Sequence, residues 1–192
     1  MKRLAVLSIF QLLFAAVVMA QAPIGSFYGL RLGMTISEVR SALSSQGKEM
    51  KSRSDNGNDY YVSNVRLGDC TFEYLYLSFS GSKLISGEFY TGEMRMGYAY
   101  APETPQSMQI FARMQTLSRE CKISFNSMKS NFRNKYGSPI MDDDDEVVWR
   151  NGSKQIKLTY LWRDEITPMD SREVETYVRI KYETLGASQS NY

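Results

Sequence analysis

The chain has 192 residues, and its 23 basic and 21 acidic side chains give a net charge of +2. This balance argues against a nucleic-acid partner, because phosphate neutralisation needs a concentrated basic surface. The sequence contains no histidine, which excludes Ser-His-Asp and Cys-His catalysis, zinc sites that use imidazole, and the usual histidine pH switch. With 43% hydrophobic residues, the chain is able to bury a core.

The N-terminus has the pattern of a signal peptide. Lys2 and Arg3 precede an almost uninterrupted apolar run over residues 4–18, and Val18-Met19-Ala20 fits the cleavage site of a signal peptidase. We therefore predict cleavage after Ala20, so that residues 1–20 are a signal peptide and the mature chain is periplasmic or extracellular. The alternative is an uncleaved anchor, but about 15 apolar residues fall short of the roughly 20 that span a bilayer. No transmembrane anchor is expected after processing.

A short strand and a helix are predicted at the start of the mature chain. Residues 28–32 alternate apolar and polar side chains as a strand does, and Gly33 ends the run. Thr35-Ile36-Ser37-Glu38 fits a capping box, in which the side chains of Thr35 and Glu38 satisfy each other's backbone donors. A helix is expected to begin here and to end near Gly47, with an apolar face formed by Ile36, Val39 and Leu43.

Three strands are predicted next, over residues 59–66, 70–79 and 83–91. The turns between them are short, and short turns indicate an antiparallel meander. Residues 101–136 return to helical spacing, and Gly137 ends that helix. Three further strands are expected at the end of the chain, over residues 147–150, 154–162 and 173–183.

The two halves share one order of elements, which is a helix, a glycine stop, a polar loop and three strands. We interpret this order as an α+β fold of two helix-plus-three-strand repeats, with antiparallel meander sheets packed against helices. A coincidental order of elements is the alternative. The predicted domains are the signal peptide, a first repeat over residues 21–100, a second over 101–185, and a disordered tail over 186–192.

The start of the first helix carries a resemblance to known proteins. Gly33-Met34-Thr35, followed by Glu38-Val39, resembles the helix start of the small outer-membrane assembly lipoproteins and of β-lactamase-inhibitor-like domains. Phe132, Lys135-Tyr136-Gly137 and Trp149 are similar to the second half of small secreted bacterial α+β proteins of mostly unassigned function. The assembly lipoproteins carry an acylated cysteine that this chain lacks. The resemblance implies a helix-on-sheet layout and non-catalytic, protein-binding relatives.

The charged clusters of the sequence do not predict a catalytic, metal or cofactor site. Residues 142–146 are five consecutive carboxylates, but they lack the alternate spacing of a calcium loop and are interpreted as a solvated acidic turn. Lys122, Lys129 and Arg133 share one helix face and are interpreted as the solvated side of an amphipathic helix. We therefore expect no catalytic residues, no metal and no cofactor.

Cys70 and Cys121 are the only cysteines, and they form an even pair in a chain predicted to be exported. They are candidates for a disulfide, because exported proteins fold in an oxidising compartment. The alternative is a pair of buried free thiols, which behave as small hydrophobic side chains.

Tyrosines are concentrated around the second and third predicted strands. The candidates for partner binding are Tyr74, Tyr76, Tyr90, Tyr98 and Tyr100. Alternation along residues 70–79 predicts that Phe72 lies on the same side as Tyr74 and Tyr76. A tyrosine ring is apolar while its hydroxyl stays hydrated, which suits a contact surface. The alternative is that the second half of the chain covers this face and makes the tyrosines part of the core.

These observations favour a secreted, non-catalytic module that binds or inhibits another protein. An envelope structural or assembly factor is the second hypothesis. A carbohydrate-active enzyme that uses only carboxylates is the third.

Overall fold

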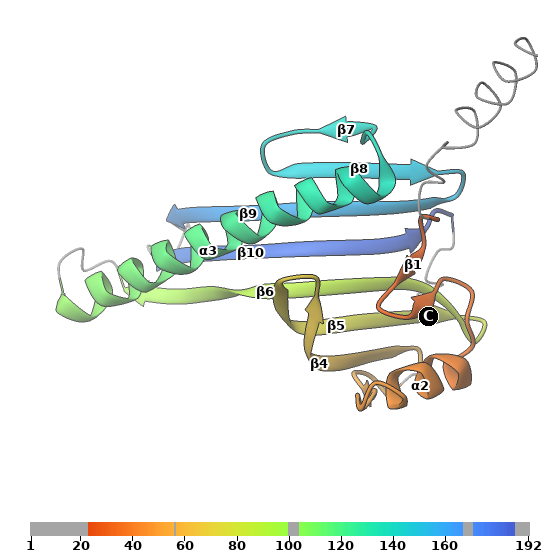
Figure 1. Cartoon of the computed structure of the whole chain (residues 1–192). Coiled ribbons are helices and arrows are strands. Elements are labelled where there is room, and N and C mark those ends of the chain that lie inside the picture. The colour runs from red at the N-terminus through yellow and green to blue at the C-terminus, as the bar shows by residue number, and fades with distance from the viewer. Residues whose placement is uncertain (1–22, 56, 100–103, 167–170, 187–192) are drawn as a thin grey trace, which may run out of the picture.

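A computed structural model of the chain describes residues 23–55, 57–99, 104–166 and 171–186. The predicted signal peptide, Tyr100 and all but the first residue of the predicted tail lie outside these residues, as does the side chain of Tyr98. An eight-stranded antiparallel sheet forms the centre of the described fold, and two helices and a small hairpin lie on one of its faces (Figure 1). The α+β class predicted from the sequence is therefore confirmed. Within the described residues, no helix is both long and apolar enough to span a membrane.

The first elements are a hairpin of β1 (Ser26–Phe27) and β2 (Leu30–Arg31), followed by α2 (Ile36–Ser44). The predicted strand over residues 28–32 is only partly right: Leu30 and Arg31 form β2, but Tyr28 and Gly29 have φ values of 48° and 71° and form the turn of the hairpin. Two consecutive positive φ values are typical of a type I′ turn.

The capping box of α2 is confirmed. The Thr35 amide donates to the Glu38 carboxylate at 2.7 Å, and the Glu38 amide donates to the Thr35 hydroxyl at 3.3 Å. Val39 and Leu43 are fully buried beneath the helix.

The predicted meander is also confirmed, with strands β4 (Asp59–Leu67), β5 (Cys70–Ser80) and β6 (Lys83–Ala99), and a short edge strand β3 (Lys51–Ser52) beside β4. Strand β6 continues well past the predicted end at Thr91. The glycine at position 92 does not stop it, because β10 pairs with β6 as far as Ala99.

The second half begins with α3 (Pro105–Tyr136), which has proline at its first position. Its end at Gly137 is as predicted, and residues 101–103 of the predicted range lie outside the described residues. The strands β7 (Met141–Asp142), β8 (Glu146–Asn151), β9 (Lys154–Ile166) and β10 (Ser171–Thr184) follow.

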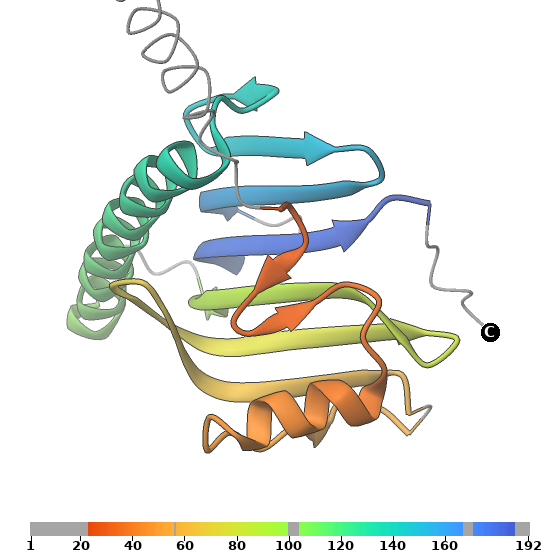
Figure 2. The same ribbon diagram turned by 45° about the vertical axis from the view of Figure 1, so that its right-hand side comes forward.

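One continuous sheet unites the two halves. Its strand order is β3-β4-β5-β6-β10-β9-β8-β7, and the long antiparallel pair of β6 and β10 lies at its centre. The helices α2 and α3 and the β1–β2 hairpin lie on the same side of this sheet (Figure 2).

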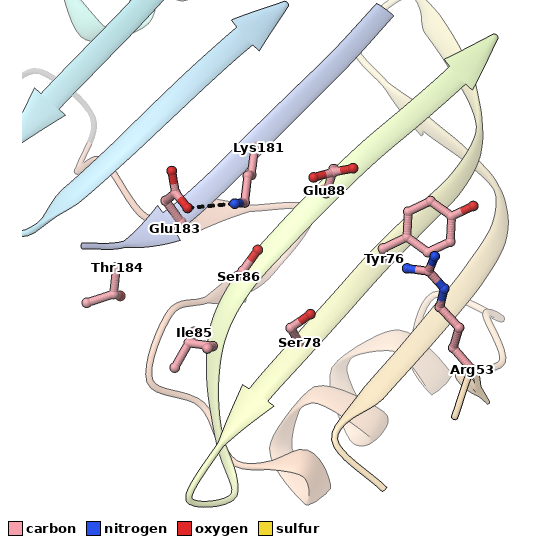
Figure 3. A pocket seen from close by; sticks show the side chains of 9 residues that line it. All are labelled: Arg53, Tyr76, Ser78, Ile85, Ser86, Glu88, Lys181, Glu183 and Thr184. Carbon is pink, nitrogen blue, oxygen red and sulfur yellow. Dashed lines mark ion pairs between the residues drawn. The ribbon is translucent and has the colours of Figure 1, made fainter. Parts of the chain in front are cut away.

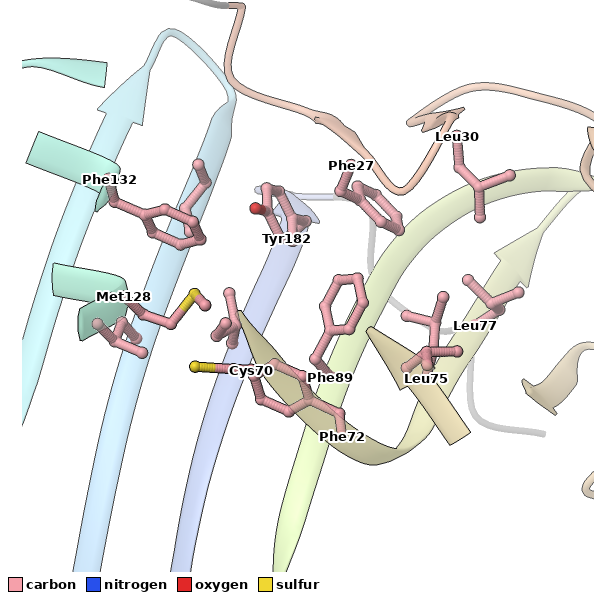
Figure 4. Packing of buried hydrophobic residues seen from close by; sticks show 14 of the residues in the cluster. Phe27, Leu30, Cys70, Phe72, Leu75, Leu77, Phe89, Met128, Phe132 and Tyr182 are labelled. Carbon is pink, nitrogen blue, oxygen red and sulfur yellow. The ribbon is translucent and has the colours of Figure 1, made fainter. Parts of the chain in front are cut away.

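The hydrophobic core fills the space between this side of the sheet and the elements that cover it (Figure 4). Phe27 of the hairpin stacks on Tyr182 of β10, with 4.6 Å between ring centroids, and meets Phe89 of β6 edge to face at 6.1 Å. On the other side of Tyr182, Phe132 of α3 packs edge to face against Trp149 of β8 at 5.6 Å. These rings join the hairpin, the sheet and α3 into one core.

The hairpin of β4 and β5 bends toward α3 near its tip. Asn64 of β4 has a φ of 52°, and the pairing of β5 with β6 stops at Tyr74. Cys70 and Phe72 therefore face the core, where Phe72 is fully buried. The predicted placement of Phe72 beside Tyr74 is wrong, because alternation along the strand is interrupted at this bend.

Candidate functional site

The face of the sheet opposite α2 and α3 carries the candidate site, and we call it the open face. None of the described helices or strands packs over it (Figures 1 and 2). The strands of the second half extend the sheet sideways, through the pairing of β6 with β10, and do not cover this face of the first half. Within the described residues, side chains on this face therefore contact one another and not a covering element.

Five tyrosines form a continuous line of ring contacts across four strands of the open face, and we call them the tyrosine row. Tyr61 contacts Tyr74 at 6.0 Å between centroids, and Tyr74 stacks on Tyr76 at 5.5 Å. Tyr76 then contacts Tyr90 at 6.4 Å, and Tyr90 contacts Tyr177 at 5.7 Å. The strand register explains the row, because residues paired across neighbouring strands present their side chains to the same face.

The rings of the tyrosine row are half-buried by one another. Burial, followed by the nearby Glu175 carboxylate, raises the pKa of Tyr90 to about 12, and burial also raises the pKa of Tyr76. Both hydroxyls therefore stay neutral at physiological pH. Each ring is held in place by its neighbours, while part of its surface remains accessible.

Two arginines lie over rings of the row. The Arg53 guanidinium is 4.5 Å from the centroid of Tyr76, and the Arg179 guanidinium is 5.3 Å from that of Tyr177. Both distances fall within the range of cation–π attraction. The tyrosine row is thus able to attract guanidinium groups.

A polar groove of about 370 Å³ lies beside Tyr76 (Figure 3). The small side chains of Ser78 and Ser86, which are paired across β5 and β6, contribute to its lining. Arg53 and Tyr76 line it on one side, and Lys181 of β10 contributes on the other. The groove therefore offers hydrogen-bonding groups and charges of both signs next to an aromatic ring.

The carboxylates of the open face differ in their ion pairing. Glu175 lies 2.8 Å from the Arg163 guanidinium, which also contacts Glu173. Glu183 lies 2.8 Å from the Lys181 ammonium. Among the described residues, Glu73 and Glu88 have no ion-pair partner within 4 Å.

The pKa of Glu183 lies below its usual value. Burial raises this pKa, but the hydrogen bonds from Lys181 and Gln155 lower it by more. A general acid of a glycosidase needs the opposite shift. Glu183 is therefore a charge that balances Lys181, and its pKa does not suit proton donation.

The structure brings together three of the predicted site residues, Tyr74, Tyr76 and Tyr90, while Tyr98 and Tyr100 lie outside the described side chains. Sequence reasoning missed Tyr61 and Tyr177. The alternation of β4 points to Tyr61, since this residue lies two positions from Asp59 and Ser63 on the same face. Tyr177 joins the row only because β10 pairs with β6, and hydrophobic periodicity does not reveal that pairing.

The predicted disulfide is wrong, because Cys70 and Cys121 are free and buried in the structure. Cys70 lies at the bent tip of the β4–β5 hairpin beside Ser124, whereas Cys121 lies against Thr176 and Val178 of β10. The two thiols thus face different neighbours. Burial is the main cause that raises the pKa of each thiol above its usual value.

The acidic turn and the basic stripe, both interpreted from the sequence as solvated, contact each other. The Lys129 ammonium lies 2.6 Å from the Asp142 carboxylate, which also pairs with Arg133. Lys122 donates to the backbone carbonyl of Asp144. These contacts fasten α3 to the turn between β7 and β8. In the described part of the chain, no group of three or more cysteine, aspartate or glutamate side chains is arranged to hold a metal ion.

Comparison of the chain with protein-family models, with curated protein sequences and with solved structures finds no match.

Proposed function

We propose that this chain is a secreted, non-catalytic module that binds another protein through the tyrosine row of its open face. The observation that carries the proposal is the row itself, which consists of five contacting rings on a sheet face that no described element covers. Tyrosine is enriched in the centres of protein interfaces, where its ring is buried and its hydroxyl finds a partner. Inhibition of the partner is one outcome of such binding.

The rigidity of the row supports this role. Stacked rings lose little conformational freedom when a partner covers them, and a preorganised surface binds more tightly than a mobile one. Tyr74 and Tyr76 are held on one strand, at 21° between their ring planes, and neighbouring strands hold the others. The open face therefore presents contact area that is already ordered.

The proposal includes a structural duplication of the chain. The order of α2, β4, β5 and β6 is repeated by α3, β8, β9 and β10. In the sheet the two sets of strands meet at the β6–β10 pair, and β4 and β5 on one side mirror β8 and β9 on the other. A duplication of this kind accounts for an open face that runs without interruption across both halves. The short strands β3 and β7 lie at the two edges of the sheet, which favours its face over its edges as a docking surface.

Export is part of the same proposal, because an exported module meets its partner outside the cytoplasm. N-terminal sequencing of the exported protein is expected to begin at Gln21. Recovery of the full-length chain from the envelope would contradict cleavage. An envelope assembly factor, the second candidate, is favoured if the protein purifies with outer-membrane proteins.

Site-specific photo-crosslinking tests the binding face. A photoreactive amino acid at Ser63, which is exposed and paired with Tyr74, probes the open face. The same amino acid at Ile123, which is 69% exposed on α3, probes the opposite side of the molecule. We expect one defined adduct from Ser63 and none from Ile123. Adducts of equal yield from both positions, or from Ile123 alone, contradict the proposal.

Substitutions of the row give the matching affinity test. Tyr74→Ala is expected to weaken binding of the crosslinked partner by about 1 to 4 kcal/mol with little change in melting temperature. Tyr60→Ala is the control, because Tyr60 packs against Phe79 at 5.6 Å on the core side of the same strands. This control should lower the melting temperature and leave the affinity of the folded protein nearly unchanged. The assignment of the face is refuted if Tyr60→Ala weakens binding while Tyr74→Ala lowers only the melting temperature.

A further inference from the structure

We infer that the partner presents a basic side chain to the open face, and that this side chain docks between Tyr76 and Tyr90 against Glu88 and Glu73. The inference rests on the protein-binding role proposed above and specifies the chemistry of the partner. The docking point lies near the middle of the tyrosine row, where the aromatic rings and the unpaired carboxylates of the open face coincide.

The two rings and the two carboxylates are neighbours in the sheet. Tyr76 and Glu88 are paired directly across β5 and β6, and Tyr90 lies two residues beyond Glu88 on the same face. Tyr76 and Tyr90 have centroids 6.4 Å apart and planes inclined at 51°. Glu73 is exposed at the bend of β5, where both Glu73 and Tyr74 lie between the buried Phe72 and Leu75, and its charge acts on Tyr90.

The carboxylates lie close enough to the rings to affect the pKa of each hydroxyl. Burial is the main cause that raises the pKa of Tyr76. The positive charge of Arg53 lowers this pKa, and Tyr74, Glu88 and Glu73 raise it by smaller amounts. Burial also dominates at Tyr90, where Glu175 and Glu73 add to the increase in pKa. The Tyr76–Tyr90 pair therefore lies within the electrostatic field of several carboxylates.

Two of these carboxylates have no ion-pair partner among the described residues. Glu175 is balanced by Arg163, at 2.8 Å. Glu88 lies opposite Lys181 in the strand register. The Lys181 ammonium, however, points toward Glu183, at 2.8 Å, and forms its ion pair there and not with Glu88 (Figure 3). Within the described residues, neither Glu88 nor Glu73 has a lysine or arginine nitrogen within 4 Å. An incoming cation would supply the missing charge.

The aromatic rings favour the same ligand. A guanidinium or ammonium over a tyrosine ring is attracted by the negative face of the ring. The position of Arg53 over Tyr76, at 4.5 Å, shows that a guanidinium fits this row. A carboxylate of the partner would instead meet Glu88 and Glu73 with like charge. Arginine suits the site better than lysine, since its planar group stacks on rings and bridges carboxylates.

Arg53 makes the inference testable in both directions. Its positive charge lies beside the docking point, so it repels an incoming cation while Glu88 attracts one. Removing the charge of Glu88 should weaken binding of a cation, and removing that of Arg53 should strengthen it. An acidic partner requires the opposite response from both substitutions.

The probe is N-acetyl-arginine amide, titrated into protein with ¹³C-labelled tyrosine rings and followed by NMR. Ring signals are assigned from Tyr76→Phe and Tyr90→Phe variants. We expect saturable shifts of the Tyr76 and Tyr90 signals. Glu88→Gln should weaken the fitted affinity by about twofold to fivefold, and Arg53→Gln should strengthen it by about the same factor. N-acetyl-glutamate amide and N-acetyl-glutamine amide are the matched controls and should not shift these signals.

Three results overturn the inference. They are no shift of Tyr76 and Tyr90 with the arginine probe, equal shifts with the glutamine probe, and an affinity that rises in Glu88→Gln. If one of these results is found but Ser63 still gives a specific adduct, the open face binds a partner of different chemistry. Loss of the adduct itself refutes the proposed function, so the two failures are distinguishable.

Discussion

The contact between Phe27 and Gly87 gives the sharpest test of the fold. The Phe27 ring lies directly over Gly87, so that a Cβ atom added to the glycine would be 2.2 Å from the ring's Cζ and 2.3 Å from a Cε atom. Ordinary contacts between carbon atoms are about 3.5 to 4.0 Å long. The substitution Gly87→Ala therefore requires the ring to move outward by about 1.5 Å, because β6 lies beneath it.

The cost of this movement follows from what the ring contacts. Phe27 is 3% exposed, stacks on Tyr182 and meets Phe89 edge to face. Overpacking a core costs about 1 to 3 kcal/mol, and complete removal of a buried phenylalanine ring costs about 3 to 5 kcal/mol. We expect Gly87→Ala to lower the free energy of unfolding by about 2 to 4 kcal/mol, which corresponds to a fall in melting temperature of roughly 4 to 16 °C.

Chemical denaturation of a double-mutant cycle measures this effect. Phe27→Ala removes the ring, so adding Gly87→Ala to that variant should cost less than about 1 kcal/mol. Ser86→Ala is the matched control, because Ser86 is adjacent in sequence but faces the groove. This substitution should change the free energy of unfolding by no more than about 0.5 kcal/mol. A neutral Gly87→Ala, or an equal cost with and without the Phe27 ring, would refute the packing described here.

Three further predictions concern the helix cap, the tyrosine row and the thiols. Thr35→Ala should lower the free energy of unfolding by about 0.5 to 2 kcal/mol in chemical denaturation, because it removes the capping box of α2. A loss below this range would contradict the cap. The raised pKa of Tyr90 means that its contribution to stability is intact below pH 10 and is lost as the pH rises toward 12. Between pH 10 and 12, Tyr90→Phe should therefore lose less free energy of unfolding than the unsubstituted protein in chemical denaturation. An equal loss in both proteins would count against burial of the ring. Titration of the unfolded, unreduced protein should find two free thiols, Cys70 and Cys121, which react slowly in the native state because they are buried; no free thiol would show a disulfide.

The local elements of this fold were predictable because their signals are local. The capping box at Thr35 and the Gly137 stop identify where α2 begins and where α3 ends, and short turns identify the meander. The predicted strand pattern failed where a single residue with positive φ interrupted it. Tyr28 adopts a positive φ and converts an apparent strand into a hairpin turn, and the bend at Asn64 moves Phe72 into the core.

The candidate site was predictable only in part, because it depends on contacts between distant segments. Tyr74 and Tyr76 share a strand, and Tyr90 lies on the next strand of the meander, so sequence alternation places all three on one face. The pairing of β6 with β10 that adds Tyr177 has no local signal. The balance between paired and unpaired carboxylates, which distinguishes Glu175 from Glu88, also follows from three-dimensional positions alone.

The central position of the β6–β10 pair has a consequence for the order in which the chain folds. Among the described strands β10 comes last in the sequence, yet it occupies the middle of the sheet and pairs along most of β6. Contacts between such distant segments form slowly, and the edge of β6 has no partner until β10 arrives. We therefore expect the nascent chain to remain incompletely folded until its C-terminal strand is available.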